Sequence, residues 1–397
     1  MPEQPVYLDH AATTPIRECA LAAWLDVTRT LADRPGNPNA VHAGGRGAKR
    51  MLEDARERLA SALGADRAEV IFTSGATESA ALGIIGAALG GRDSSIVTDE
   101  GVSGRIVVSG IEHPAVAEGG ERAEAAGIEW KVLPTTRDGR ALLEPGSLGP
   151  ATTLASLAMV CSETGVIQPV PDLVRLGKQK KFLVHSDATQ AVGNLALDFQ
   201  GLGLDLMTIG GHKFGAPVGT GALLVKRGVK IVTDRPGGGQ ERTIRSGTQD
   251  VAGAVALAVA AEEAVSQIEE RSVKHLALRE QLAKNLPENV RMTELAESVP
   301  SIVHLSMSTR HPEAVLLELD RAGILASAGS ACHAGVTRPS QVLLSMGRSE
   351  DEALGVLRVS FGRDSSSHDV DALIRALPGA VAAAQKLDAL EAEGRVR

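Results

Sequence analysis

Short apolar runs alternate with longer amphipathic stretches over the first 270 residues, and this alternation constrains the fold more than any other feature. The apolar runs have the length of strands, and the stretches between them carry apolar residues at helical spacing. Strands separated by helices predict an α/β fold with a mostly parallel sheet. We predict strands at residues 69–72, 105–108, 154–160, 182–185, 205–209 and 222–225, and helices at residues 17–32, 46–63, 77–89, 115–126, 171–179 and 251–270.

The regular alternation stops after about residue 270. The rest of the chain predicts a smaller α+β unit, which ends in a helical, charged segment at residues 381–397. No internal repeat, low-complexity tract or long linker separates the two parts, so we expect them to pack tightly together. Within the smaller unit we predict strands at residues 302–305 and 357–361, and helices at residues 313–322 and 370–377.

The composition is typical of a folded, soluble protein. The 397 residues have room for two or three domains, and 43% apolar with 23% charged residues argues against disorder. The formal net charge of −8 does not favour general nucleic-acid binding, although it leaves a local basic patch open. No apolar run reaches the roughly 18 residues of a membrane-spanning helix, and the first ten residues lack a secretory signal.

The three cysteines, Cys19, Cys161 and Cys332, lie far apart in the chain. Because no CxxC pair is present, we expect neither a structural zinc site nor a disulfide framework, and free thiols fit the reducing cytoplasm. The sequence also lacks the Walker A, HExxH and GxSxG motifs. It therefore does not predict a P-loop nucleotide site, a zinc protease or a serine hydrolase.

The first motif with chemical content joins a strand to a helix at residues 72–79, FTSGATES. A helix start exposes backbone N–H groups and the positive end of the helix dipole, which together bind anions. Ser74 and Thr77 add hydroxyl donors. Taken alone, this segment is better explained as an ordinary helix cap.

Two further motifs put an acid and an amine at strand ends. Asp187 follows an apolar strand in the sequence HSDATQ, and Lys213 follows another in LMTIGGHKFG. In an open α/β sheet, ligands bind beyond the carboxyl ends of the strands. Taken singly, Asp187 fits a helix cap and Lys213 fits the surface. Together, a carboxylate for a pyridinium nitrogen and a lysine for an aldehyde are the pair that pyridoxal phosphate (PLP) requires.

The fourth motif surrounds Cys332 with very small residues, in the sequence AGSACHAG at residues 328–335. Cysteine is usually a small buried apolar residue, but no bulky neighbour in the sequence helps to bury this one. The composition is typical of a mobile loop. A Cys–His hydrolase built on Cys332 and His333 is disfavoured, because adjacent residues rarely face each other and no oxyanion site is evident.

With these four motifs in this order, the chain resembles the cysteine desulfurases of the NifS/IscS type, within the class-V, fold-type I PLP enzymes. The resemblance runs from YLDHAATTP at residues 7–15 to RVSFGR at residues 358–363. It implies a large domain with a mostly parallel seven-stranded sheet and a smaller α+β domain that carries the catalytic-cysteine loop. The implied ranges are 15–262 for the large domain, 1–14 with 263–397 for the small domain, and about 326–340 for the loop.

The resemblance also implies a role for each matching residue. Lys213 matches the lysine that bonds to the cofactor, Asp187 the partner of the pyridinium nitrogen, and Cys332 the nucleophile that receives sulfur. His113, in IEHP, matches the imidazole that stacks on the PLP ring. Arg358 matches the group that binds the substrate carboxylate, a task that suits a guanidinium. The remaining matches are Ala76, Thr77 and His212 on the phosphate side, Thr248 as a phosphate contact from the other subunit of a homodimer, Gln190 and Ser162 near the phenolic oxygen of PLP, and Asn37 in an active-site loop that contacts substrate.

Two positions depart from the family pattern. The family has Asn-Asn-Glu-[Thr/Ile]-Gly where this chain has CSETG, so Ser162 replaces an asparagine that reaches the cofactor and the substrate. The family also has Ser-Gly-His-Lys where this chain begins with Gly210, which removes one phosphate contact. A hydrogen bond to a charged group contributes about 1.5–3 kcal/mol, so this loss would lower cofactor affinity by about tenfold or more.

The implied reaction converts L-cysteine to L-alanine and leaves a persulfide on Cys332. The persulfide sulfur would pass to an iron–sulfur scaffold or a tRNA- or cofactor-thiolation protein, without direct contact with nucleic acid or membrane. A selenocysteine lyase is the nearest alternative, since it would use the same scaffold. A class-V aminotransferase would leave Cys332 without a role. A weakly PLP-binding partner protein would be supported only by Ser162 and Gly210.

Overall fold

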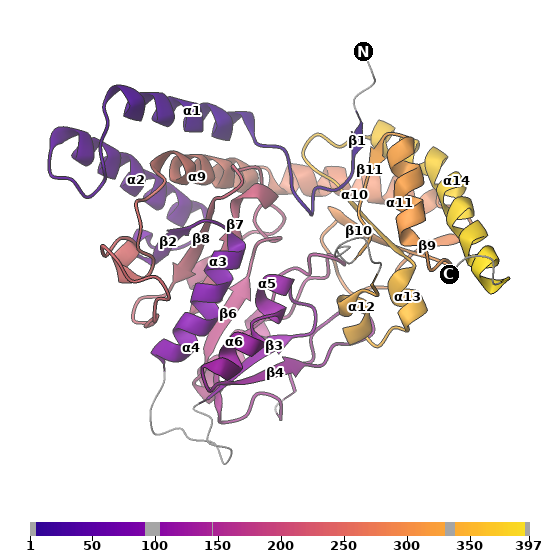
Figure 1. Ribbon diagram of the computed structural model, residues 1–397, viewed down its shortest axis with the longest axis horizontal. Helices are drawn as coiled ribbons and strands as arrows, with labels where there is room; N and C mark the ends of the chain where they lie inside the picture. The colour runs from indigo at the N-terminus through magenta and orange to yellow at the C-terminus, as the bar shows by residue number, and fades with distance from the viewer. Residues whose placement is uncertain (1–4, 92–103, 145, 330–337, 394–397) are drawn as a thin grey trace.

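The computed structural model of the protein describes residues 5–91, 104–144, 146–329 and 338–393. A seven-stranded sheet forms its larger part (Figure 1), and it is mostly parallel, as predicted. The strand β8 runs antiparallel to both of its neighbours, and the other strand pairs are parallel. In spatial order the strands are β2 (Val70–Thr73), β8 (Gly221–Val225), β7 (Leu206–Gly210), β6 (Leu183–Asp187), β5 (Thr152–Ser156), β3 (Arg105–Ser109) and β4 (Glu129–Leu133).

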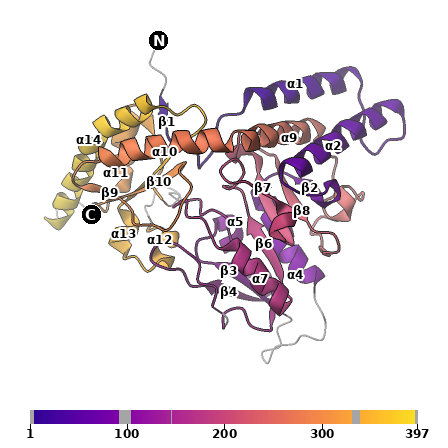
Figure 2. The same ribbon diagram turned by 180° about the vertical axis from the view of Figure 1, so that it is seen from behind.

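Helices cover both faces of this sheet, because its strands are apolar on both sides. Val70 and Phe72 belong to the core on one face, and Ile71 between them belongs to the core on the other. The two helical layers can be followed in Figures 1 and 2. The Ile71 face packs against α3 (Ala76–Ala81), a π-helical turn (Leu82–Gly86), α4 (Ala87–Gly90), α5 (Pro114–Ala117) and α6 (Gly120–Ala125). The other face packs against α2 (Ala43–Ala62), α7 (Val170–Lys180), α8 (Phe199–Leu202) and α9 (Val251–Ser266). The helix α1 (Glu18–Asp33) packs against α9.

The smaller part contains two short sheets and the last helices of the chain. The N-terminal strand β1 (Val6–Tyr7) joins it by pairing in parallel with β11 (Ile324–Leu325). The other sheet is antiparallel, in the order β12-β10-β9. The domain ranges given by the sequence analysis, 15–262 for the large domain and 1–14 with 263–397 for the small one, remain a prediction. The elements are α10 (Ile268–Lys284), β9 (Val290–Met292), β10 (Ile302–Met307), α11 (Pro312–Arg321), α12 (Gln341–Ser345), α13 (Glu350–Leu354), β12 (Val356–Ser360) and α14 (Ser367–Ala392).

Several element boundaries differ from the sequence prediction. The strand β4 was not predicted, because its sequence EWKVL mixes charged with apolar residues, as suits a half-buried edge strand. The strand predicted at 154–160 ends at Ser156. The predicted helix at 115–126 divides into α5 and α6 around Gly119, where a Cβ would lie 2.8 Å from the Trp130 ring.

Two helix predictions also need correction at the level of whole elements. The helix predicted at 251–270 ends at Ser266, and a separate helix, α10, begins at Ile268. Conversely, the helix predicted at 370–377 and the charged segment after it, as far as Ala392, form one helix, α14, which accommodates Pro378 in its interior.

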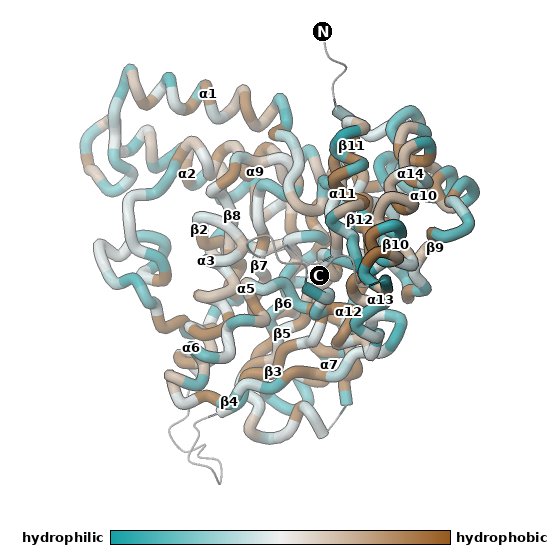
Figure 3. Tube along the Cα trace, turned by 45° about the vertical axis from the view of Figure 1, so that its right-hand side comes forward, coloured by the Kyte–Doolittle hydropathy of each residue, from teal (hydrophilic) through white to brown (hydrophobic). Residues whose placement is uncertain are grey.

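Hydropathy follows this layering in Figure 3, where the strand β3 is apolar and the outer helix α1 alternates between polar and apolar residues. Among the described residues, no single helix is both long and apolar enough to cross a membrane. The criterion is met only by α9 and α10 taken together, and these two meet at a bend of 64°.

Candidate active site

The carboxyl ends of β2, β6 and β7 open onto one cavity of about 300 Å³. This is the edge of the sheet at which a ligand was predicted. The structure therefore brings together residues that are more than 130 positions apart in the sequence. The predicted site residues that line the cavity are Ala76, Thr77, His113, Ser162, Asp187, Gln190, His212 and Lys213.

At one end of the cavity, the turn between β2 and α3 offers backbone donors. The N–H of Ser74 donates to the Glu78 carboxylate over 2.6 Å, and the N–H of Gly75 donates to Thr73 Oγ1 over 3.4 Å. Among the described residues, no acceptor is found for the N–H groups of Ala76 and Thr77, which belong to the first turn of the helix. This end of the cavity thus suits an anion.

Two glycines let the backbone approach this turn closely. A Cβ on Gly221 of β8 would lie 2.6 Å from the Cα of Gly75, so no side chain fits there. A Cβ on Gly210 of β7 would lie 3.0 Å from the Cβ of Ala76. The glycine that replaces the family's serine therefore packs directly against the predicted phosphate contact Ala76.

Asp187 and Gln190 are fixed at the end of β6. Asp187 Oδ1 accepts the N–H of Thr189 over 2.9 Å, and Asp187 is buried. Gln190 Nε2 donates to the carbonyl of Ala11 over 2.8 Å. The hydroxyl of Thr189 lines the cavity as a buried polar atom without a hydrogen-bond partner among the described residues, so it is available to a ligand.

Lys213 lies in a 3₁₀ turn after β7 and reaches back to the N-terminal segment. Its Nζ donates to the carbonyls of Ala11 and Ala12, each over 2.7 Å. Burial, and then the positive charge of Arg358, lower the pKa of Lys213 from 10.5 to about 8. Burial and the charge of Lys213 likewise lower the pKa of the neighbouring His212 to about 4, so His212 is neutral at pH 7.

His113 caps the N-terminus of α5 and presents its ring to the open cavity. Its Nδ1 accepts the N–H of Ala115 over 3.1 Å, which assigns the proton of the neutral ring to Nε2. Desolvation by the surrounding protein lowers the pKa of His113. The preceding residue, Glu112, is buried and accepts hydrogen bonds from Ser109 and Ala158, each over 2.8 Å, so it ties the His113 loop to the cavity wall.

Arg358 of β12 lies in the smaller part of the molecule and contacts the cavity wall at Ser162. One of its terminal nitrogens donates to the carbonyl of Ser162 over 3.0 Å, and the other pairs with Asp9 over 2.9 Å. Its Nε is buried without a hydrogen-bond partner among the described residues. A guanidinium held in this way retains a donor for an incoming carboxylate.

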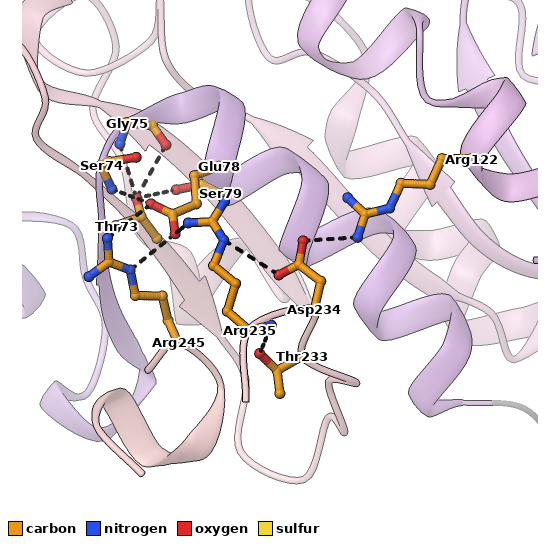
Figure 4. A network of polar contacts seen from close by, with 10 residues as sticks. All are labelled: Thr73, Ser74, Gly75, Glu78, Ser79, Arg122, Thr233, Asp234, Arg235 and Arg245. Atoms are coloured by element: carbon orange, nitrogen blue, oxygen red, sulfur yellow. Dashed lines mark hydrogen bonds and ion pairs between the residues drawn. The ribbon is translucent and has the colours of Figure 1, made fainter. Parts of the chain in front are cut away.

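Glu78 was not among the predicted site residues, yet it joins several side chains at the end of the cavity formed by the turn between β2 and α3 (Figure 4). Its buried carboxylate accepts hydrogen bonds from Arg235 and Arg245, and Asp234 extends the network to Arg122. Burial alone would raise the pKa of Glu78, but hydrogen bonds, chiefly from Arg245 and Ser74, outweigh it and lower the pKa. The position of Glu78 inside the motif FTSGATES was the sequence feature that could have identified it.

Three predicted residues, Arg358, Thr248 and Asn37, are not among the residues that line this cavity. Thr248 lines an adjacent cavity of about 130 Å³, which shares Ser74, Gly219 and Thr220 with the first one. Asn37 is exposed, and its side chain accepts the N–H of Asn39 over 2.9 Å. Cys332 lies outside the described residues.

The residues present fit PLP. Lys213 supplies an amine with a lowered pKa for the aldehyde, and Asp187 supplies a carboxylate for the pyridine nitrogen. The partnerless N–H groups of Ala76 and Thr77 supply donors for a phosphate. The unpaired hydroxyl of Thr189 adds a further donor.

Comparison with known proteins gives a consistent result. The family described as Aminotransferase class-V matches residues 6–373. An IscS-like cysteine desulfurase of Mycobacterium tuberculosis is 42% identical, covering 98% of this chain and 100% of its own. The cysteine desulfurase IscS of Methanosarcina thermophila is 36% identical, covering 94% and 91%. The solved structure of a NifS-like protein superposes with a TM-score of 0.85 at 30% identity, covering 96% and 100%.

Proposed function

The chain belongs to the class-V aminotransferase family and, within it, to the NifS/IscS-type cysteine desulfurases; from this premise we propose which of its residues carry the reaction. It is a PLP-dependent cysteine desulfurase. The observation that carries the proposal is that Lys213 and Asp187 line one cavity, while Arg358 is bound to its wall at Ser162.

When bound, PLP supplies an aldehyde for the substrate amine and a ring that draws electrons from its Cα. Arg358 binds and orients the carboxylate of L-cysteine. Lys213 removes the Cα proton, a role supported by its pKa of about 8. Asp187 keeps a proton on the pyridine nitrogen, and His113 donates the proton on its Nε2 to the product carbon, which leaves as L-alanine.

Cys332 is proposed as the thiolate that takes the substrate sulfur as a persulfide. A thiol of an acceptor protein then removes this sulfur. The acceptor is proposed to be an iron–sulfur scaffold or a tRNA-thiolation enzyme, and the thiol chemistry suits the reducing cytoplasm.

A homodimer is also proposed, in which Thr248 donates to the phosphate held by the partner subunit. Two observations support it. Thr248 lies in a neighbouring cavity, away from Lys213 of its own chain. Val218, on the rim of the cavity, is 82% exposed, and burial against another subunit would remove this apolar surface from water.

The decisive experiment measures sulfide and alanine released from L-cysteine with an added thiol reductant, for the wild type and for Cys332→Ala. Equal amounts of both products from the wild type, with a silent variant, are expected. The same assay with L-selenocysteine distinguishes a selenocysteine lyase, which would prefer that substrate and tolerate Cys332→Ala. No product from PLP-loaded wild type would contradict the proposal.

A further inference from the structure

Glu163 is a buried carboxylate that the proposed mechanism does not use. It follows Ser162, a wall residue of the cavity, and is only 5% exposed. Its Oε1 accepts a hydrogen bond from the hydroxyl of Ser340, which is fully buried. The two residues lie 177 positions apart, so this contact joins two distant parts of the chain.

The same carboxylate lies against Gly329. A Cβ on Gly329 would lie 2.3 Å from Glu163 Oε1 and 2.9 Å from its carboxyl carbon, so the carboxylate already fills that space. The chain just before this point is also fixed, because Ser327 and Arg358 exchange backbone hydrogen bonds of 2.7 and 3.3 Å. Glu163 therefore contacts the described residues on both sides of the segment that carries Cys332.

The buried side chain of His304 also lies near the Glu163 carboxylate. His304 of β10 is 1% exposed, and its Nδ1 is within 2.8 Å of Thr293 Oγ1. Its Nε2 lies 3.7 Å from Glu163 Oε1 and has no hydrogen-bond partner among the described residues. Glu163 is therefore packed among Ser340, Gly329 and His304.

We propose that Glu163 is a positioning residue for the sulfur-transfer step, because one of its oxygens holds Gly329 and Ser340 at the two ends of the Cys332 segment. This inference rests on the proposed role of Cys332. Bringing two distant parts of a chain together costs conformational entropy, and the contacts of Glu163 with Gly329 and Ser340 offset part of this cost. A misplacement of about 1 Å between reacting groups can lower a rate by about 100-fold, so loss of the tie acts on turnover.

The test compares Glu163→Ala with Glu163→Gln in the full-length, PLP-loaded protein. For Glu163→Ala we expect kcat for alanine formation to fall by at least about tenfold, with KM nearly unchanged. Cofactor content and the absorption change on adding L-cysteine should match the wild type. Glu163→Gln keeps an oxygen for the Ser340 hydroxyl, so it should stay within about fivefold of wild-type kcat.

A second readout needs no turnover. Iodoacetamide alkylation of Cys332 without substrate, followed by peptide mass spectrometry, should be at least about threefold faster in Glu163→Ala, since the contacts of this carboxylate with Gly329 and Ser340 are lost. The partly exposed Cys19 of α1 serves as an internal reference.

Two serines provide a matched control. Ser340 and Ser349 each cap a short helix, accepting the N–H of Leu343 over 3.1 Å and of Glu352 over 3.2 Å. Of the two, Ser340 also contacts Glu163. Ser340→Ala should therefore lower kcat, whereas Ser349→Ala should leave it unchanged. This pair keeps the proposal testable even if Glu163→Ala does not fold, which its thermal unfolding would reveal.

Wild-type kcat together with a wild-type alkylation rate in Glu163→Ala would overturn the proposal. So would loss of PLP or of the absorption change, because Glu163 would then act through the cofactor cavity. A PLP-loaded wild type that makes no alanine would refute the proposed function instead. In that case the alkylation rates would still decide whether Glu163 holds the segment.

Discussion

The surroundings of Lys213 lower its pKa, and this shift gives a testable prediction about its reaction with the PLP aldehyde. An amine attacks an aldehyde only when neutral. At a pKa of about 8 roughly one Lys213 in ten is neutral at pH 7, against about one in 3000 at 10.5. Reconstitution of the apoenzyme with PLP should therefore become faster as pH rises, with a midpoint near 8.

The control for this prediction is Arg358→Gln. Removing a nearby positive charge makes the ammonium form of Lys213 less unfavourable, so the midpoint should move upward. PLP has its own titrations, but these are common to both proteins, so the difference between them reports Lys213. Identical midpoints would show that Arg358 does not act on the lysine.

At this scale the sequence identified residues that line the cavity but not those that hold them in place. Asp187 and Lys213 were identifiable because each follows an apolar strand within a short motif. Asp9 and Glu163 were not, because their partners Arg358 and Ser340 lie 349 and 177 residues away. Only the folded chain shows which side chains, distant in the sequence, come into contact.

At the scale of elements, the loop after β8 is held to α2 and β2 by one buried ion pair. Both terminal nitrogens of Arg56 bond to the Glu241 carboxylate, over 2.7 and 2.8 Å, and Glu241 also accepts the N–H of Phe72. Glu241 and the next two residues, Arg242 and Thr243, have positive φ values of 44°, 56° and 65°, which non-glycine residues adopt only when strongly held.

Glu241→Ala should therefore lower the free energy of unfolding by about 3–5 kcal/mol, because it leaves the buried Arg56 charge with only its single ion pair, to the more exposed Glu53, over 3.3 Å. The matched control is Glu262→Ala, since Glu262 and its partner Arg58 are 39% and 42% exposed. That change should cost less than about 1 kcal/mol. Urea unfolding measures both, and equal losses would contradict the importance assigned to burial.

The same loop shows where reasoning about elements from the sequence stops. The central strands β6 and β7 were predicted because each begins with a short apolar run. The edge strand β4 was missed, since its half-buried positions do not require apolar residues. Irregular loops such as 240–248 carry no periodic pattern, and long-range contacts determine their conformation.

For the whole molecule, three parts of the chain meet at Arg358, the proposed substrate-binding residue. This residue belongs to β12 of the smaller part, Asp9 follows the N-terminal strand, and Ser162 lies on the wall of the cavity beside the large sheet. A single planar guanidinium spans both contacts, which a lysine ammonium cannot do from one position.

Arg358→Lys should therefore raise KM for L-cysteine by about tenfold or more, corresponding to loss of one charge-assisted hydrogen bond. Cofactor content should stay unchanged, because Arg358 is not among the residues that line the cofactor cavity. Arg363→Lys is the control, since Arg363 lies on the same side of the molecule and bonds to the carbonyl of Ile16. Steady-state kinetics with measured PLP content checks both variants. A fall in kcat for Arg358→Lys at constant KM would assign Arg358 to the chemical step. An equal rise in KM for both variants would show that the loss of affinity comes from packing between the smaller and larger parts of the molecule, and not from recognition of the substrate carboxylate.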